Sequence, residues 1–329
     1  MLLNGLFCFS LAFVVAFLIS PLVIYFSKKL KASQTILHYV KEHKKKQGTP
    51  TMGGFIFIIG TISASFLCFN SDYTYALLTI ITMLAYATLG FLDDFIKIKT
   101  KKNLGLKAYQ KIIGQVGISF IIAFFIYNYV STEIAIPFSN SSLDLGIFII
   151  PFIVIFFVAL VNSVNLIDGL DGLCSGVSFA YLLGFLMLLS LSLPVLTGTI
   201  LIETQNLILV CSCLMGALFA FLVFNGYPAS IFMGDTGSLA IGGFLSALAV
   251  FTGYELYVLI LGLPFVLTAL SDIIQVLYFK KTRKRVFLMA PLHHHFEKKG
   301  INENKIVILY IVTTFLLSIL TFILASYFI

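Results

Sequence analysis

Ten long apolar runs decide what this chain of 329 residues can fold into. A transmembrane helix needs roughly 20 predominantly apolar residues, and the runs approach or exceed that length. Only 11% of the residues are charged, against about 25% in soluble domains, which excludes a water-soluble globule. The sequence therefore predicts a single-domain, all-α polytopic membrane protein over residues 1–329. The runs lie at 5–27, 51–70, 73–92, 111–130, 146–163, 173–193, 206–224, 238–253, 257–279 and 306–328.

The basic residues predict how these helices cross the membrane. All 21 Lys and Arg except Lys305 lie in three clusters, at 28–46, 97–111 and 280–299. Because cytoplasmic loops are enriched in Lys and Arg, the three clusters should share the cytoplasmic side. Two apolar runs separate the first two clusters and six separate the second from the third, as that requires. The pattern predicts ten transmembrane helices with both termini on the outer side.

The residues that could perform chemistry collect on the predicted cytoplasmic face. It holds all five His and, if Asp272 is counted, nine of the 14 carboxylates. The outer connections carry carboxylates but no Lys, Arg or His. An active site is therefore expected on the cytoplasmic side. The segments predicted to lie there are 28–50, 93–111, 164–172, 225–237 and 280–304.

Two adjacent carboxylates, Asp93 and Asp94, lie at the inner end of the third run in GFLDDFIK. Adjacent helical residues point about 100° apart, so both can border one cleft without coinciding. The pair suits a metal ligand beside a proton acceptor. The alternative is a solvated pair at a helix end, although a negative charge is electrostatically disfavoured at a helix C-terminus.

Two Gly-rich polar segments interrupt the apolar pattern further along the chain. NSVNLIDGLDG (162–172) combines two Asn, two Asp and two Gly, which is more than a simple polar turn requires. In FMGDTGSL (232–239) a Gly-flanked Asp235 precedes hydroxyl residues at a predicted helix start, a composition that suits Mg²⁺ with a phosphate. Phe232 could stack on a base or anchor in the membrane interface. ATP- and NAD-type glycine patterns are missing from the sequence.

Three consecutive imidazoles, His293 to His295, lie in the most basic segment. Consecutive residues cannot all face one zinc ion without an unusual backbone, and no Cys assists them. Donation to phosphate oxygens fits the surrounding basic residues better. Carboxylates, Mg²⁺ and a basic rim suit phosphoryl transfer, here between a lipid phosphate and a soluble nucleotide, with no role for nucleic acid.

Together these segments resemble the polyprenyl-phosphate N-acetylhexosamine-1-phosphate transferases, and the triple-His motif resembles the muramoyl branch of that family. The resemblance implies transfer of phospho-MurNAc-pentapeptide from UDP-MurNAc-pentapeptide to undecaprenyl phosphate, which gives lipid I and UMP in peptidoglycan synthesis. It further implies Mg²⁺ as cofactor, a homodimer, and the bacterial cytoplasmic (inner) membrane. The motifs that carry it are GTPTMGG (48–54), GFLDDFIK (90–97), NSVNLIDGLDGL (162–173), FNGYPASIFMGDTGSL (224–239) and APLHHHFEKKG (290–300).

The same resemblance assigns roles to individual residues. Asp235 corresponds to the principal Mg²⁺ ligand, with Asp94 as a second candidate. Asp171 and Gly169 fall where the family binds uridine, and Phe232 falls where it stacks on uracil. The catalytic positions are Asp93, Asp94, Asp235 and His293, and the substrate-binding positions are Lys46, Lys97, Lys111, Asn162, Asn165, Asp168, Gly169, Leu170, Asp171, Asn225, Phe232, Gln275, His294 and His295.

The chain departs from the family pattern in two places. The segment 34–43 lacks the Arg and Gly-Pro pair that the family tends to carry, which leaves its role open. Thr268 stands where the ninth helix usually holds a Glu, and Asp272 follows one turn later on the same face. Asp272 is therefore either a substitute for that Glu or a structural partner of Lys280 or another polar group.

Several alternatives stay open at this stage. One is a transferase that uses UDP-N-acetylglucosamine, and a remoter one is a secondary transporter, although transporters place their sites near the bilayer midplane. The chemistry could proceed in one step or through an aspartyl-bound phospho-sugar. The five Cys show no metal-binding spacing and are interpreted as small buried hydrophobic residues.

Overall fold

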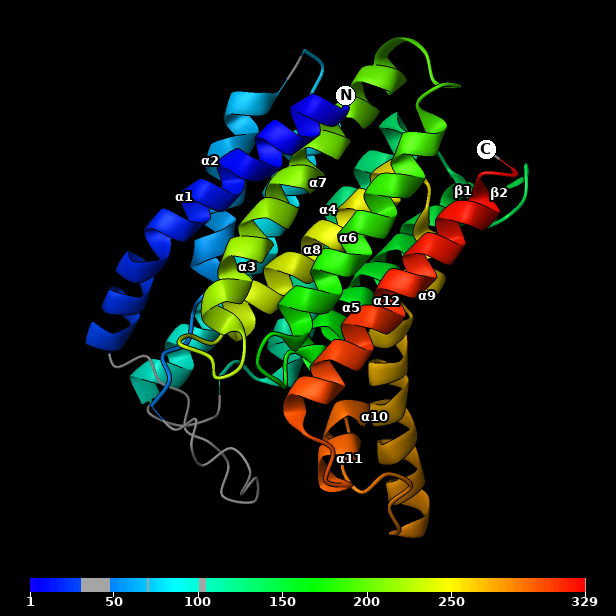
Figure 1. Cartoon of the computed structure of the whole chain (residues 1–329). Coiled ribbons are helices and arrows are strands. Elements are labelled where there is room, and N and C mark those ends of the chain that lie inside the picture. Colours follow the sequence, from blue (N-terminus) through cyan, green and yellow to red (C-terminus); the bar gives the residue numbers. More distant parts are fainter. Residues whose placement is uncertain (31–47, 70, 101–104, 329) are drawn as a thin grey trace.

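The computed structural model describes residues 1–30, 48–69, 71–100 and 105–328 (Figure 1). These residues form a bundle of helices with one short two-stranded hairpin. The elements are α1 (Leu2–Lys29), α2 (Gly54–Cys68), α3 (Thr74–Thr100), α4 (Ala108–Tyr129), β1 (Glu133–Ala135), β2 (Ser142–Asp144), η2 (Gly146–Phe148), α5 (Ile149–Ile167), α6 (Leu173–Ser192), α7 (Gly198–Asn225), α8 (Gly234–Thr252), η3 (Glu255–Tyr257), α9 (Val258–Leu261), α10 (Leu263–Thr282), α11 (Leu292–Lys298) and α12 (Glu303–Ala325).

The chain is an all-α polytopic membrane protein, as its apolar runs predict. Among the described residues, nine helices are long and apolar enough to cross a membrane, and α2 is a shorter apolar helix of 15 residues. Each of the ten predicted runs overlaps one of these helices. The antiparallel β1–β2 hairpin, with Glu133 opposite Asp144, was not predicted. It lies in the polar stretch between two runs, where the backbone groups of the two strands pair with each other.

Described segments that were predicted to share a face meet at a common end of the bundle. At one end, the Glu203 carboxylate accepts hydrogen bonds from the backbone N–H groups of Thr74 (3.1 Å) and Tyr75 (2.8 Å), which joins the starts of α7 and α3. The hairpin lies beside the α8 C-terminus, where the Ala135 N–H donates to the Gly253 carbonyl. At the other end, among the described residues, Asp93, Asp94 and Asp235 meet Asn165, and the Asp-Gly turn after α5 meets the His residues of α11.

Helix α8 lies at the centre of the bundle and positions the site. Its span is 94% buried, against 22% for the spans of α1 and α10. It packs against α3, α5 and α2, because small residues let the backbones approach closely. Gly237 on α8 contacts Gly54 on α2, and Gly90 on α3 lies directly against the Asp235 carbonyl. The first turn of the most buried helix therefore carries Asp235.

Helix α10 extends beyond the lower end of the bundle in Figure 1 and leads to the short helix α11. The Gln275 side-chain oxygen accepts hydrogen bonds from the backbone N–H groups of Val286 (3.1 Å) and Phe287 (2.9 Å). The Ser271 hydroxyl accepts one from the Leu292 N–H at 3.0 Å. These bonds fold the connection back and bring the three His residues of α11 toward the end of α5.

Candidate active site

Three carboxylates that are distant in the sequence meet at one end of α8. Asp93 and Asp94 come from the inner part of α3, and Asp235 comes from the first turn of α8. One oxygen of each lies within 4.8 Å of the others. Asp93 and Asp94 are each only 1% exposed. The structure therefore brings together the three carboxylates that the sequence identified as catalytic.

Asp94 is held by the start of α8. Its Oδ2 atom accepts hydrogen bonds from the Thr236 N–H (2.9 Å) and the Thr236 hydroxyl (2.7 Å), and its Oδ1 atom accepts one from the Asp235 N–H (3.2 Å). The two N–H groups are backbone donors that a helix N-terminus leaves without an intrahelical partner. Asp94 thus links α3 to α8 and fixes the position of Asp235. Thr236 is one of the hydroxyl residues noted after Asp235 in the sequence, but its role as a donor to Asp94 was not predicted.

Two lysines neutralise the carboxylate cluster. The Lys97 ammonium lies 2.6 Å from Asp93 and 3.0 Å from Asp235. The Lys111 ammonium lies 2.5 Å from Asp235 and 3.4 Å from Asp93. Both side chains are partly exposed, at 24% and 21%, so they are accessible to an anionic ligand from the solvent side. The partners of Asp93 are these two side-chain ammonium groups and the Leu106 N–H at 2.8 Å. Asp94, in contrast, is held by hydrogen bonds from the start of α8.

The end of α5 supplies the next polar groups. The Asn165 amide donates to Asp235 Oδ1 at 3.0 Å and to the Ser238 hydroxyl at 2.8 Å. Asp168 follows directly after α5. Burial, together with the negative charges of Asp235 and Asp94, raises its pKa to about 8. Asn165 therefore orients Asp235, while Asp168 retains a proton in part of the population near neutral pH.

Asn162 lies one turn before Asn165, and its hydrogen bonds go to α4 and to its own helix. Its amide donates to the Gln115 side-chain oxygen at 2.7 Å and to the Val158 carbonyl at 2.7 Å. Gln115 is fully buried on α4. The structure thus gives Asn162, a predicted substrate-binding residue, a helix-to-helix hydrogen bond through a Gln that the sequence analysis did not identify.

The Asp-Gly turn packs directly on the triple-His helix. A methyl group at Gly169 would overlap the His293 Nε2 atom and lie 3.1 Å from the His294 Nε2 atom. His293 is fully buried, and its ring lies 4.3 Å from that of His294. His294 Nδ1 is 2.6 Å from the Glu297 carboxylate. This position therefore requires glycine because the two imidazoles occupy the space of a side chain.

The second Asp-Gly step ties two loops together. Asp171 accepts a hydrogen bond from the Ala229 N–H at 3.0 Å, and its own N–H donates to Glu303 at 2.8 Å. Asn225 accepts from the Gly172 N–H and donates to the Ile231 carbonyl at 3.1 Å. These contacts hold the segment before Asp235 in place. The sequence analysis did not identify Glu303, which lies at the start of α12.

The remaining predicted residues lie around this core. Leu170 is 4% exposed and belongs to the hydrophobic core. Phe232 is half-buried, and its backbone pairs with Pro50 at 2.8 Å. The His295 Nδ1 atom accepts from the Leu288 N–H at 3.1 Å, so this imidazole and Gln275 hold the α10–α11 connection. Lys46 and the segment 34–43 lie outside the described residues.

The ninth-helix positions differ in environment. Thr268 is fully buried and donates to the Pro264 carbonyl at 2.7 Å. Asp272 is half-buried on α10, and the carboxylate interacts electrostatically with His294. The Asp272 carboxylate therefore lies near the triple-His helix.

The donor set at the carboxylate cluster fits a hard divalent cation. Mg²⁺ prefers oxygen ligands and is usually bound by one or two carboxylates plus substrate phosphates. Asp93 and Asp235 offer such oxygens beside two accessible ammonium groups that could hold those phosphates. Asp94 has both oxygens engaged by α8 and is the least available of the three.

Comparison with known proteins places this geometry in a family. The model of glycosyl transferase family 4 matches residues 75–253, which include all three carboxylates. Across 95% of its length, the chain is 45% identical to the phospho-N-acetylmuramoyl-pentapeptide-transferase of Thermoanaerobacter sp. and covers 97% of that protein. The enzyme of that name from Clostridium kluyveri is 43% identical, and that from Clostridium perfringens is 41% identical; the match covers 96% of each.

The chain belongs to the phospho-N-acetylmuramoyl-pentapeptide-transferase family. The resemblance seen in the five motifs is thereby confirmed. Because these relatives match 95% of the chain, the similarity extends beyond the family-model region at 75–253.

Proposed function

We propose that this protein transfers phospho-MurNAc-pentapeptide from UDP-MurNAc-pentapeptide to undecaprenyl phosphate, giving lipid I and UMP. The observation that carries the proposal is the meeting of three carboxylates and two lysines at one end of a membrane bundle. Relatives named phospho-N-acetylmuramoyl-pentapeptide-transferase, which the chain matches over almost their whole length, support it. The UDP-N-acetylglucosamine alternative is not favoured by these relatives.

Mg²⁺ is proposed as the cofactor, held chiefly by Asp235. When bound, it would neutralise charge that develops on the phosphate oxygens. Lys97 and Lys111 bind the pyrophosphate oxygens from the solvent side, and Asn165 keeps the Asp235 carboxylate oriented. His293 supplies a further hydrogen-bond donor from α11.

Asp93 is the proposed proton acceptor for the lipid phosphate. Its partners are the Leu106 N–H and two ammonium groups that substrate phosphates can recruit. Asp94 accepts three hydrogen bonds from α8, which stabilise its charge and engage both of its oxygens. The arrangement favours a direct attack of the lipid phosphate over a mechanism in which Asp94 is the nucleophile.

The proposed setting is the bacterial cytoplasmic membrane, crossed ten times, with the carboxylate end facing the cytoplasm. The clustering of Lys and Arg in the segments that precede and follow the site helices in the sequence supports this orientation, and α2 would be the tenth span. A homodimer is proposed from the family resemblance alone.

The test is UMP release by detergent-purified protein with UDP-MurNAc-pentapeptide, undecaprenyl phosphate and Mg²⁺. Asp235→Asn should abolish release, whereas Asp144→Asn is a matched control in the exposed hairpin at the other end of the bundle. UDP-N-acetylglucosamine in place of the muramoyl nucleotide forms a second arm. Turnover of that sugar alone, or full activity of Asp235→Asn, would contradict the proposal.

A further inference from the structure

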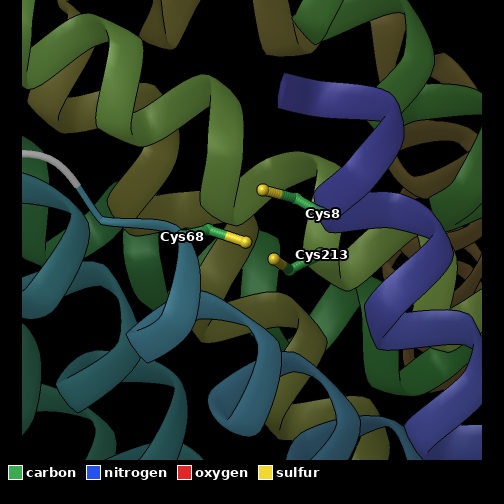
Figure 2. A group of neighbouring side chains, drawn as sticks. All are labelled: Cys8, Cys68 and Cys213. Atoms are coloured by element: carbon green, nitrogen blue, oxygen red, sulfur yellow. The ribbon is translucent and has the colours of Figure 1, made fainter. Parts of the chain in front are cut away.

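Three cysteines from three helices meet near the end of the bundle opposite the carboxylates. Cys8 lies on α1, Cys68 is the last residue of α2, and Cys213 lies on α7. Figure 2 shows their side chains pointing toward one another. The sulfur atoms lie within 4.8 Å of one another. The spacing in the sequence gave no sign of this cluster, because each cysteine comes from a different helix.

Close packing of the helices creates the cluster. Gly216 on α7 lies against the Phe9 carbonyl of α1, and Gly5 lies near Ser212, so α1 and α7 approach closely on either side of the sulfur atoms. Gly60 of α2 fits against α1 in the same way. The three thiols are therefore held together by rigid elements.

The surroundings of the cluster favour ligand binding over simple packing. Cys8 and Cys213 are buried at 1% and 0% exposure, whereas Cys68 is half-buried and gives access from the membrane end. Ser65, one turn before Cys68, is fully buried, and its hydroxyl interacts with the Cys213 thiol, so a polar group adjoins the three sulfur atoms.

We propose that Cys8, Cys68 and Cys213 form a binding site for a single soft metal cation, with Cu(I) as the best-fitting ion. Soft thiolate ligands select Cu(I), Zn²⁺ and iron–sulfur clusters. A metal–sulfur bond of about 2.3 Å in a trigonal site places the sulfur atoms ~4 Å apart, so the existing separation needs to contract by less than about 1 Å. Structural Zn²⁺ sites take four ligands, and the cluster supplies three thiols.

Binding exchanges protons for the metal. Each thiol that forms a metal–sulfur bond releases its proton to water, and the half-buried Cys68 provides the route. No change of oxidation state is needed when the ion is supplied as Cu(I). The site is independent of the transferase reaction, since it lies at the other end of the bundle.

The test measures metal binding by the full-length protein in detergent under anaerobic conditions. Cu(I) is titrated against a chromogenic Cu(I) chelator, and Cd²⁺ and Zn²⁺ are titrated in separate arms. The sulfur-to-metal absorption of the Cd²⁺ form counts the thiolates. We expect one Cu(I) per chain, bound more tightly than Zn²⁺, and three thiolates on Cd²⁺.

The matched variants are Cys213→Ala and Cys211→Ala. Both residues are buried on α7, but Cys211 lies outside the cluster, with its sulfur 3.7 Å from the Leu182 carbonyl. Cys213→Ala should weaken Cu(I) binding at least about tenfold, and Cys211→Ala should leave it unchanged. If Cys213→Ala unfolds, Cys68→Ala at the accessible position serves in its place. Equal binding by the variants, no stoichiometric binding, or a disulfide within the trio in the purified protein would overturn the proposal.

Discussion

The contrast between Asp93 and Asp94 gives the sharpest test of the site. Asp94→Asn should destabilise the protein, because the Asn side chain offers one acceptor oxygen and one NH₂ group to three donors from α8. Two of the three hydrogen bonds then go to a neutral amide oxygen instead of a charged carboxylate. The third is lost, because the NH₂ group and a backbone N–H, both donors, face each other. Bonds to charged groups contribute about 1.5–3 kcal/mol each, so the expected loss of stability is ~2–4 kcal/mol.

Asp93→Asn should behave differently. Its partners are two partly exposed ammonium groups and one backbone N–H, so its loss should leave the fold intact and remove turnover. The measurement pairs thermal unfolding in detergent with UMP release for both variants. Asp94→Asn is expected to unfold at a clearly lower temperature, and Asp93→Asn near that of the unmodified protein. The reasoning is refuted if Asp94→Asn unfolds normally, or if Asp93→Asn retains turnover.

Three further predictions concern groups around the site and at the far end. Gly169→Ala should reduce kcat/KM about tenfold or more, because the methyl group displaces His293 at a cost of ~1–3 kcal/mol; steady-state kinetics of a well-folded variant measure this. Asn165→Ala should raise the Mg²⁺ concentration needed for half-maximal rate, because Asp235 loses a 3.0 Å hydrogen bond; an unchanged Mg²⁺ titration would contradict it. Glu255 is 2% exposed, and burial raises its pKa to about 8. The folded state thus binds more protons than the unfolded state from about pH 4.5 to 8, so stability falls as pH rises through that window. Glu255→Gln should remove this slope and stabilise the protein by up to about 3 kcal/mol at pH 7, as unfolding at several pH values would show.

The arrangement of the helices was largely predictable from the sequence, for a physical reason. Burying charge in a bilayer is costly, so the places where Lys and Arg occur mark the helix ends. The charge pattern had assigned Glu203 and the start of α3 to one face, and they are hydrogen-bonded to each other. It had assigned Asp235 and the end of the 162–173 motif to the other face, and Asn165 of that motif donates to Asp235. The hairpin at Glu133 escaped prediction because three-residue strands leave almost no periodic signal.

The residues of the site were predictable from the sequence, but the different environments of its three carboxylates were not. The sequence placed Asp93, Asp94 and Asp235 together, yet it could not show that α8 engages both oxygens of Asp94. That follows from the close packing of α3 on α8, which depends on Gly90. The Gly169 contact with α11 was equally invisible, because the two segments are more than 120 positions apart and meet only through the fold of the α10–α11 connection.

The lysine positions lead to a final prediction about the order of events at the site. In this arrangement Lys97 and Lys111 act as internal counterions of Asp235. A nucleotide pyrophosphate that draws the ammonium groups away leaves the carboxylate free for Mg²⁺, so the two ligands should bind cooperatively. Coupling is reciprocal and typically amounts to about 5–150-fold. Calorimetric titration of UDP-MurNAc-pentapeptide with and without Mg²⁺ measures the coupling, and Lys111→Met should reduce it toward unity while the bundle stays folded. Equal nucleotide affinity in the presence and absence of Mg²⁺ would show that the lysines do not compete with the cation for Asp235.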